Sequence, residues 1–192
     1  THHYYSQRIA NYQKNFSIDQ VWKVAAHISS ALFTIHSRGY MHLDVSPANI
    51  LHSEDPKLGA IYKLSDFGTL LKVGTFKEDD EGAGPYVSPE ALSFPHSFHK
   101  VTEKTDIFSF GVVLYELLTK RNAPREFPGY EQLRTGTFKF QQLPQEFSFV
   151  IDMMNLNPDE RPSAEDITGM MKCREELDRV SQTSNEMRSP VS

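Results

Sequence analysis

The sequence predicts a mainly helical domain that carries one small β-hairpin. Residues 105–119 are apolar on nearly every side, which indicates a helix buried in a core. Residues 21–35 place apolar side chains at helical spacing, so a second helix with one buried stripe is expected. Residues 50–51 and 62–64 have the composition of two short strands around a turn. The 192 residues are enough for one domain with a sizeable core.

The chain before the first long helix is polar and aromatic. We expect residues 1–15 to form a short exposed helix. The two adjacent histidines at residues 2–3 lack further nearby ligands, so no metal site is expected there. Ser17, with Gln20 three residues later, is a capping box that begins the next helix. Gly39 is expected to end that helix.

The C-terminal half alternates loops and helices. Residues 69–86 contain several glycines and acids, which predicts a mobile loop. A short helix is expected over residues 130–135, and an apolar stripe follows at residues 147–154. Residues 157–162 have the composition of a turn. Ser163 is expected to cap the last helix.

Composition excludes several classes of protein. The net charge is -5 and no basic stripe occurs, which argues against nucleic-acid binding. Cys173 is the only cysteine, so there is no disulfide framework and an intracellular, reducing compartment is expected. No apolar run reaches the ~18 residues that a membrane span needs. We expect one domain over residues 1–176 and a polar, disordered tail over residues 177–192.

Three polar motifs follow one another in the middle of the chain. Asp44 lies five positions before Asn49, with apolar residues on both sides. Asp-Phe-Gly follows at residues 66–68, and Ser-Pro-Glu at residues 88–90. Taken singly, each acid or amide would be an ordinary turn residue. Together they match the catalytic-loop, metal-loop and activation-segment motifs of protein kinases, so the sequence resembles that family.

The resemblance implies a fold and a set of catalytic roles. The fold is the C-terminal lobe of a protein kinase, a helical bundle whose hairpin carries the catalytic and metal loops. The Gly-rich loop and strand lysine of the N-terminal lobe do not occur before the catalytic loop, so we expect that lobe to be absent and this chain alone to be inactive. The implied cofactors are ATP and Mg²⁺. Asp44 would be the catalytic base, Ser46 and Asn49 would complete the catalytic set, and Asn49, Leu51 and Asp66 would bind the nucleotide, with Asn49 and Asp66 as the Mg²⁺ ligands.

The same resemblance assigns structural roles. Asp106 is expected to accept backbone hydrogen bonds near His42. Glu90 and Arg161 are expected to form a buried ion pair, and breaking such a pair typically costs ~3–5 kcal/mol. Phe67 would pack behind the metal-loop acid. The structural set is His42, Phe67, Gly68, Glu90, Asp106 and Arg161.

Two positions depart from the common kinase pattern. Leu43 stands where most kinases have an Arg that receives an activation-loop phosphate. We therefore hypothesise that phosphorylation of Thr69 or Thr75 does not switch this protein on. Ser46 stands where Ser/Thr kinases carry a Lys, and Ala48 does not supply the Arg of tyrosine-specific kinases.

Three segments narrow the resemblance to the Wee/Myt kinases, which inhibit cyclin-dependent kinases. These segments are residues 36–51, 104–108 and 129–136. The resemblance implies a protein substrate, a cyclin-dependent kinase, phosphorylated on Tyr and the neighbouring Thr to delay mitosis. The membrane-associated Myt branch is slightly nearer than the nuclear one. Nucleus or cytoplasm is therefore expected, with any membrane anchor in regions outside this sequence.

The sequence is compatible with two classes of function. Retention of Asp44, Asn49 and Asp66 favours an active kinase. The serine at position 46 and the missing N-terminal motifs favour a pseudokinase, a binding module that keeps the fold and docks a partner without transferring phosphate.

Overall fold

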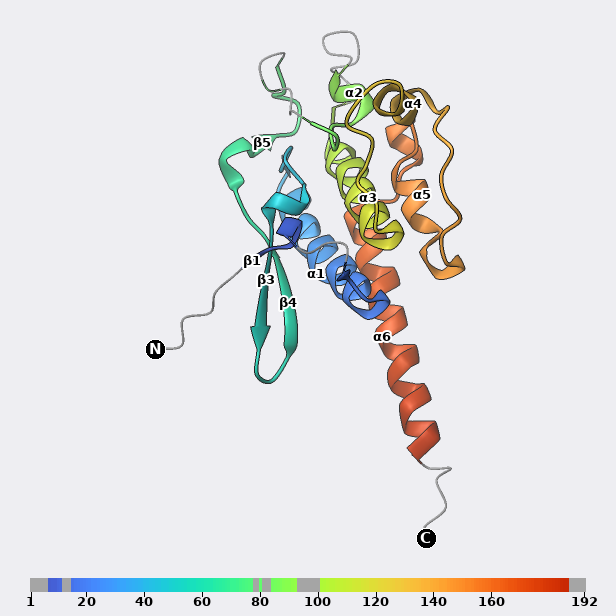
Figure 1. Cartoon of the computed structure of the whole chain (residues 1–192). Coiled ribbons are helices and arrows are strands. Elements are labelled where there is room, and N and C mark those ends of the chain that lie inside the picture. The colour runs from blue at the N-terminus through green and yellow to red at the C-terminus, as the bar shows by residue number, and fades with distance from the viewer. Residues whose placement is uncertain (1–6, 12–14, 78–79, 81–83, 93–100, 187–192) are drawn as a thin grey trace.

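The computed structural model describes residues 7–11, 15–77, 80, 84–92 and 101–186. A bundle of helices lies beside a β-hairpin, and the last helix continues away from the bundle (Figure 1). The helices are α1 (Ile18–His36), α2 (Pro89–Leu92), α3 (Lys104–Thr119), α4 (Gly129–Thr135), α5 (Phe149–Met153) and α6 (Ala164–Glu186). The strands are β1 (Gln7–Arg8), β2 (Tyr40–Met41), β3 (Ile50–Asp55), β4 (Gly59–Leu64) and β5 (Leu71–Lys72).

Helix α1 begins with the predicted capping box. The Ser17 hydroxyl accepts from the backbone N–H of Gln20 at 3.2 Å, and the Gln20 side chain accepts from the Ser17 N–H at 2.9 Å. Just beyond the helix, Gly39 has a φ of +77°, which glycine adopts without strain. The predicted apolar stripe is buried, apart from Ile35, which is partly exposed. The helix leads directly into β2 and the polar loop that follows.

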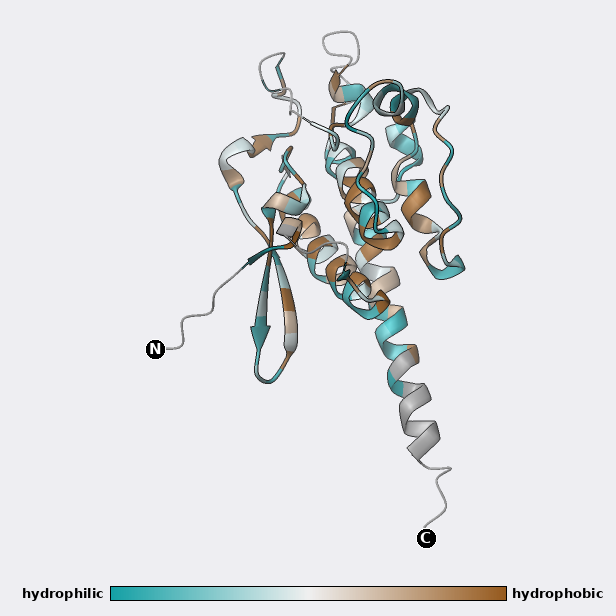
Figure 2. Ribbon diagram, viewed as in Figure 1, coloured by the Kyte–Doolittle hydropathy of each residue, from teal (hydrophilic) through white to brown (hydrophobic). Residues whose placement is uncertain are grey.

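Helix α3 is the central helix of the bundle. Its residues 105–117 are all buried, as the sequence predicts. Gly111 permits a close approach of α5, because a Cβ there would lie 2.9 Å from Met153 Cβ and from Met154 Cγ. The apolar residues concentrate on α1, α3 and α5, where Figure 2 shows them in brown.

The hairpin is longer than the sequence predicts. Strands β3 and β4 pair antiparallel from Ile50 opposite Leu64 to Asp55 opposite Gly59. Only residues 56–58 remain in the turn, because one Asp55 carboxylate oxygen accepts from the next two free backbone N–H groups. Part of the loop predicted after the hairpin is also paired, since β5 runs antiparallel to β2.

Two predictions about the ends of the chain differ from the structure. The exposed helix predicted over residues 1–15 is wrong for residues 7–11, which form β1 on the edge of β3 and a 3₁₀ turn with Ile9 fully buried. The free edge of β3 and the burial of this isoleucine outweigh local helix propensity. Residues 1–6, including the paired histidines, lie outside the described part of the chain.

Helix α6 also differs from its predicted length. Ser163 caps it as predicted, accepting from the N–H of Asp166 at 3.1 Å while the Asp166 carboxylate accepts from the Ser163 N–H at 2.8 Å. The helix then continues to Glu186, so residues 177–186 are helical where a disordered tail was predicted. This stretch contains neither Gly nor Pro. Its polarity therefore does not prevent a helix.

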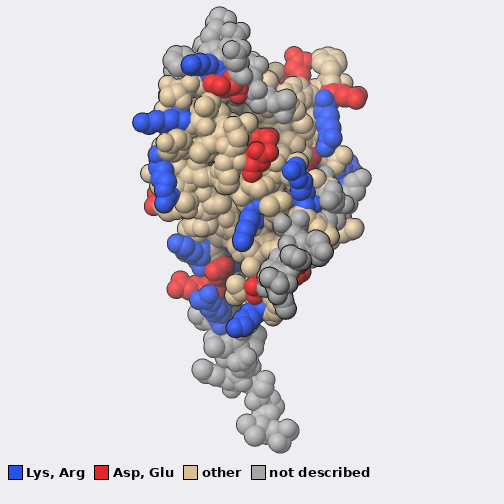
Figure 3. Space-filling view, turned by 90° about the vertical axis from the view of Figure 1, so that its left-hand side faces the viewer, with Lys and Arg blue, Asp and Glu red and all other residues tan. Residues whose placement is uncertain are grey.

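The surface carries charges of both signs. On the face shown in Figure 3, Lys and Arg side chains are separated by uncharged and acidic residues rather than gathered in a stripe. Among the described helices, none combines the length and apolarity required to cross a bilayer.

Candidate active site

The loop between β2 and β3 holds two of the predicted site residues together. Asn49 ends a 3₁₀ turn, Pro47–Asn49, and is almost fully buried. Its Nδ2 donates to the Asp44 carboxylate at 2.6 Å and to the Asp44 backbone carbonyl at 2.9 Å. The amide nitrogen is therefore committed to Asp44. No described residue donates a hydrogen bond to Asn49 Oδ1, which leaves that oxygen available to a cation.

Asp106 anchors the start of this loop from α3. Its fully buried carboxylate accepts from the backbone N–H of His42 at 2.7 Å and of Leu43 at 2.8 Å, as predicted. Leu43 has a φ of +64°, a strained conformation for a residue with a side chain. The hydrogen bonds to Asp106 hold the loop in that conformation.

A third contact to Asp106 was missed by the sequence analysis. Nε2 of His36, in the last turn of α1, lies 2.8 Å from the Asp106 carboxylate. The only sequence signal is the position of His36, one turn before the loop. The contact joins α1, α3 and the catalytic loop at one buried point.

The metal loop lies against the catalytic loop through hydrogen bonds to backbone carbonyls. Ser65 donates its N–H and its hydroxyl to the Asn49 carbonyl, both at 2.9 Å. Nε2 of His42 lies 3.1 Å from the Ser65 carbonyl, and Thr69 Oγ1 donates to the His42 carbonyl at 2.7 Å. Because Asp66 directly follows Ser65, the structure brings the backbones of Asp44, Asn49 and Asp66 close together.

Asp66 and its neighbours show how the metal loop is shaped. Asp66 has a φ of +63°, and its carboxylate accepts from the Gly68 N–H at 3.4 Å. Phe67 packs edge-on against the ring of His42, with ring centroids 5.3 Å apart. Phe67 is 52% exposed, so the structure does not bury its ring behind Asp66 as predicted, and the ring contact with His42 lies at the surface.

The donor set suits a hard cation. Asn49 Oδ1 and the Asp66 carboxylate are the oxygen donors that Mg²⁺ prefers. Across the residues that the structure describes, no group of three or more His, Cys, Asp or Glu side chains could hold a metal. Mg²⁺ in phosphate-handling enzymes needs only one or two protein carboxylates, because phosphates and water complete its coordination.

The two remaining predicted site residues lie on either side of Asn49. Ser46 is mostly buried and precedes the 3₁₀ turn without making a side-chain capping bond. Leu51 is partly exposed on β3, paired with Arg8 of β1 on one side and Lys63 of β4 on the other.

The predicted ion pair between Glu90 and Arg161 is present. Arg161 donates from Nη1 and Nη2 to the two carboxylate oxygens of Glu90, at 2.6 and 2.9 Å. The guanidinium also donates to the backbone carbonyls of Asn155 and Lys104, and Thr105 donates its hydroxyl to Glu90. Both charged side chains are buried, so the pair ties α2 to the bundle.

A second buried carboxylate was not predicted. Glu116 of α3 accepts from the Tyr86 hydroxyl at 2.8 Å and from the Ala123 N–H at 2.5 Å. Burial raises the pKa of Glu116. Burial, together with the nearby Glu116 carboxylate, raises the pKa of Tyr86. Tyr86 and Glu116 are 30 positions apart, and no local sequence motif predicts their contact.

Leu43, the unusual residue of the catalytic loop, packs into a small apolar cluster. The buried members of the cluster are Met41, Phe76, Val87, Ala91 and Val101, and Leu43, Leu71, Val73 and Leu92 pack against them. These residues come from β2 and the catalytic loop, from β5 and the chain after it, from α2 and the residue before Ser88, and from the chain just before α3. Apolar packing therefore joins the catalytic loop to the activation segment.

Comparison with known proteins identifies the family. A family model for the protein kinase domain matches residues 2–171. A probable protein kinase of Dictyostelium discoideum is 34% identical over 72% of this chain and 38% of its own length. A Wee1-like protein kinase of Oryza sativa subsp. japonica is 34% identical over 73% of this chain and 26% of its own length.

A kinase named for a different substrate is equally similar. The eukaryotic translation initiation factor 2-alpha kinase 3 of Rattus norvegicus is 31% identical over 78% of this chain. The aligned part covers 15% of that kinase, and the chain spans well under half of each relative. The motifs, their contacts and the family match agree: the chain belongs to the protein kinase family.

Proposed function

We propose that this chain supplies the catalytic and magnesium-binding loops of a kinase that transfers the γ-phosphate of ATP to a protein hydroxyl. The observation that supports this most directly is the double hydrogen bond from Asn49 Nδ2 to Asp44. It fixes an acid beside an amide whose oxygen is available to a cation. An acid in that position orients the substrate hydroxyl and accepts its proton, which is typically worth about 10²–10⁴-fold in rate.

Asn49 and Asp66 would hold Mg²⁺, and Leu51 would contact the nucleotide. When bound, Mg²⁺ neutralises the charge that develops on the phosphates. The chain's own contribution is positioning. Asp106 holds the catalytic loop through two backbone N–H groups, and Ser65 holds the metal loop on the Asn49 carbonyl.

For the substrate, we propose a cyclin-dependent kinase, with a role in control of the G2/M transition. The similarity to a Wee1-like protein kinase and the leucine in place of the usual catalytic-loop Arg support this choice. A nuclear or cytoplasmic location would follow. The translation initiation factor 2-alpha subunit is the second candidate substrate, supported by the 31% identity to a kinase named for it.

A pseudokinase is the alternative from another functional class. Ser46 supplies no cation where kinases carry one near the transferred phosphate, which would slow transfer. In that case the fold would serve as a docking module for a protein partner.

The deciding experiment is a Mg²⁺-ATP transfer assay of the full-length protein. A cyclin-dependent kinase and the initiation factor 2-alpha subunit are offered in parallel, and Asp44→Asn is the control. The proposal expects transfer that falls about 10²–10⁴-fold in the variant. Equal transfer by wild type and Asp44→Asn would overturn the assigned mechanism. No transfer to any protein, with retained binding of a partner, would favour the pseudokinase.

A further inference from the structure

Three consecutive backbone carbonyls before α2 are bound by side chains from two other helices. Arg134 of α4 donates from Nη2 to the Pro85 carbonyl at 2.8 Å and from Nε to the Val87 carbonyl at 3.0 Å. Ser109 of α3 donates its hydroxyl to the Tyr86 carbonyl, between them, at 2.7 Å. The conformation of residues 85–87 therefore depends on α3 and α4.

Arg134 is held by these carbonyls rather than by an acid. Its Nη1 donates to the Tyr130 carbonyl at 2.9 Å, and the guanidinium lies 3.7 Å from the centroid of the Tyr130 ring. In the part of the chain that the structure describes, no carboxylate lies within ion-pair distance of it. Burial lowers the pKa of Arg134, yet an arginine stays charged in proteins. Backbone oxygens and one aromatic face thus stabilise this partly buried cation.

The segment that Arg134 holds lies beside the catalytic loop. Val87 is buried in the same apolar cluster as Met41, and Leu43 packs against that cluster. These two residues flank His42, and Leu43 immediately precedes Asp44. A displacement of residues 85–87 would therefore disturb the surface next to the catalytic acid, whereas the metal loop has its own contacts through Ser65 and Thr69.

We propose that Arg134 is a positioning residue that fixes residues 85–87 against the catalytic loop, so that a protein substrate meets a preformed surface. This inference rests on the proposed kinase function. Binding energy is lost when a docking surface must be ordered first, so loosening the segment raises the KM for the protein substrate. The residues proposed to hold the Mg²⁺ of ATP lie outside residues 85–87. The KM for ATP is therefore expected to stay unchanged.

The test uses Arg134→Gln in the full-length protein, with two separate measurements. The first is the rate of chymotrypsin cleavage after Tyr86, followed by mass spectrometry, which requires no kinase activity. Loss of hydrogen bonds from a charged donor is expected to accelerate this cleavage about tenfold or more. The second is steady-state kinetics, where we expect the KM for the protein substrate to rise about tenfold, with kcat and the KM for ATP little changed.

Two further variants sharpen the comparison. Arg134→Lys keeps the charge but cannot reach three carbonyls at once, so an intermediate effect is expected. It also serves if Arg134→Gln does not fold. Arg38→Gln is the matched control, because Arg38, just beyond the end of α1, donates from its guanidinium to the Thr34 carbonyl and to no other described residue, and it is expected to change neither measurement.

The outcomes separate this inference from the proposed function. Unchanged cleavage after Tyr86 in both Arg134 variants overturns the inference, as does equal acceleration in Arg38→Gln. A KM for ATP that rises as much as the KM for the protein substrate also overturns it, because that result indicates general loosening. If the wild-type protein transfers no phosphate but Arg134→Gln is still cleaved faster after Tyr86, Arg134 does hold residues 85–87. The proposed kinase function would then be wrong.

Discussion

Arg161 and Glu90 lie 71 positions apart and share two parallel hydrogen bonds inside the bundle. Arg161 is 2% exposed, and its remaining contacts are backbone carbonyls and the ring of Phe108, 5.0 Å from the guanidinium. Neither charge can reach water if the other is removed. The pair is therefore expected to hold α2, and with it the end of the activation segment, in place.

The first prediction concerns this pair. Glu90→Gln leaves the buried guanidinium without a counter-charge and should lower the free energy of unfolding by about 3–5 kcal/mol. Chemical denaturation measures the loss. Glu54→Gln is the matched control, because the pair between Glu54 and His52 lies at the surface and should be worth less than about 1 kcal/mol. Equal losses in the two variants would contradict the role assigned to the buried pair.

The contacts that sequence analysis predicted are those with local signals. The capping residues Ser17 and Ser163 act within one helical turn, and the catalytic and metal loops are contiguous motifs. The pair of Glu90 and Arg161 was also predicted, but only through the family resemblance. Physical patterning alone would not have joined them.

The contacts that were missed join distant residues without a shared motif. Arg134 binds carbonyls 47 and 49 positions away. Every residue has a backbone carbonyl, so the sequence does not indicate which of them will accept. Glu116 would pass for a surface residue of a helix if its neighbours were unknown. The length of α6 was missed for a different reason, since a polar stretch is typical of a disordered tail as well as of an exposed helix.

The second prediction is that phosphorylation of the activation segment does not raise activity. Leu43 joins that segment by apolar packing, and a leucine cannot bind a phosphate. Thr69 already donates its hydroxyl to the His42 carbonyl, and a phosphate there would break that bond. Phosphatase treatment of the full-length protein should leave its activity unchanged. A large rise on phosphorylating Thr69 or Thr75 would contradict the prediction.

The third prediction concerns a buried hydroxyl in the Ser-Pro-Glu motif. Ser88 is fully buried, and no group in the described chain pairs with its Oγ. An unsatisfied buried polar group typically costs about 1–3 kcal/mol. Ser88→Ala should therefore raise the melting temperature, measured by differential scanning calorimetry. A clear drop would indicate that the hydroxyl has a partner in solution.

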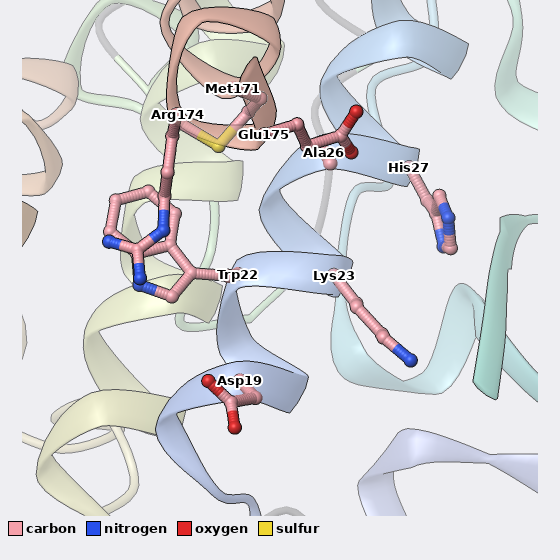
Figure 4. A pocket seen from close by; sticks show the side chains of 8 residues that line it. All are labelled: Asp19, Trp22, Lys23, Ala26, His27, Met171, Arg174 and Glu175. Carbon is pink, nitrogen blue, oxygen red and sulfur yellow. The ribbon is translucent and has the colours of Figure 1, made fainter. Parts of the chain in front are cut away.

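The fourth prediction is a loss of stability at mildly acidic pH. His27 faces the pocket between α1 and α6, with Lys23 and Glu175 as its charged neighbours (Figure 4). Burial, and then the Lys23 charge, lower the pKa of His27 below its ordinary 6.5, while Glu175 opposes them. The unfolded chain therefore binds a proton that the folded chain does not. Stability contributed by the neutral ring should be lost as the pH falls from about 6.5.

A single variant isolates that contribution. His27 Nδ1 accepts from the Tyr62 N–H at 3.1 Å, and the side-chain oxygen of Asn can replace this acceptor. His27→Asn should flatten the fall in unfolding free energy below neutral pH. The contribution of Glu116 to the pH dependence of stability has the opposite sign. Because its pKa is raised, the folded state binds a proton before the unfolded state does as the pH falls. Identical pH profiles for wild type and His27→Asn would assign the acid sensitivity to other groups.

The last prediction tests the missing cation of the catalytic loop. Two unit charges ~4 Å apart interact by about 4 kcal/mol at an effective dielectric of 20, so a lysine near the transferred phosphate can change the rate by orders of magnitude. Ser46 makes no capping bond that a substitution would remove. Ser46→Lys should therefore raise kcat in the full-length protein, and Ser46→Met, of similar length without charge, should not. A turnover that is unchanged or lower in Ser46→Lys would show that the missing cation does not limit transfer. If the wild type is silent and only the lysine variant transfers phosphate, the natural protein is a pseudokinase that retains a competent acid at Asp44.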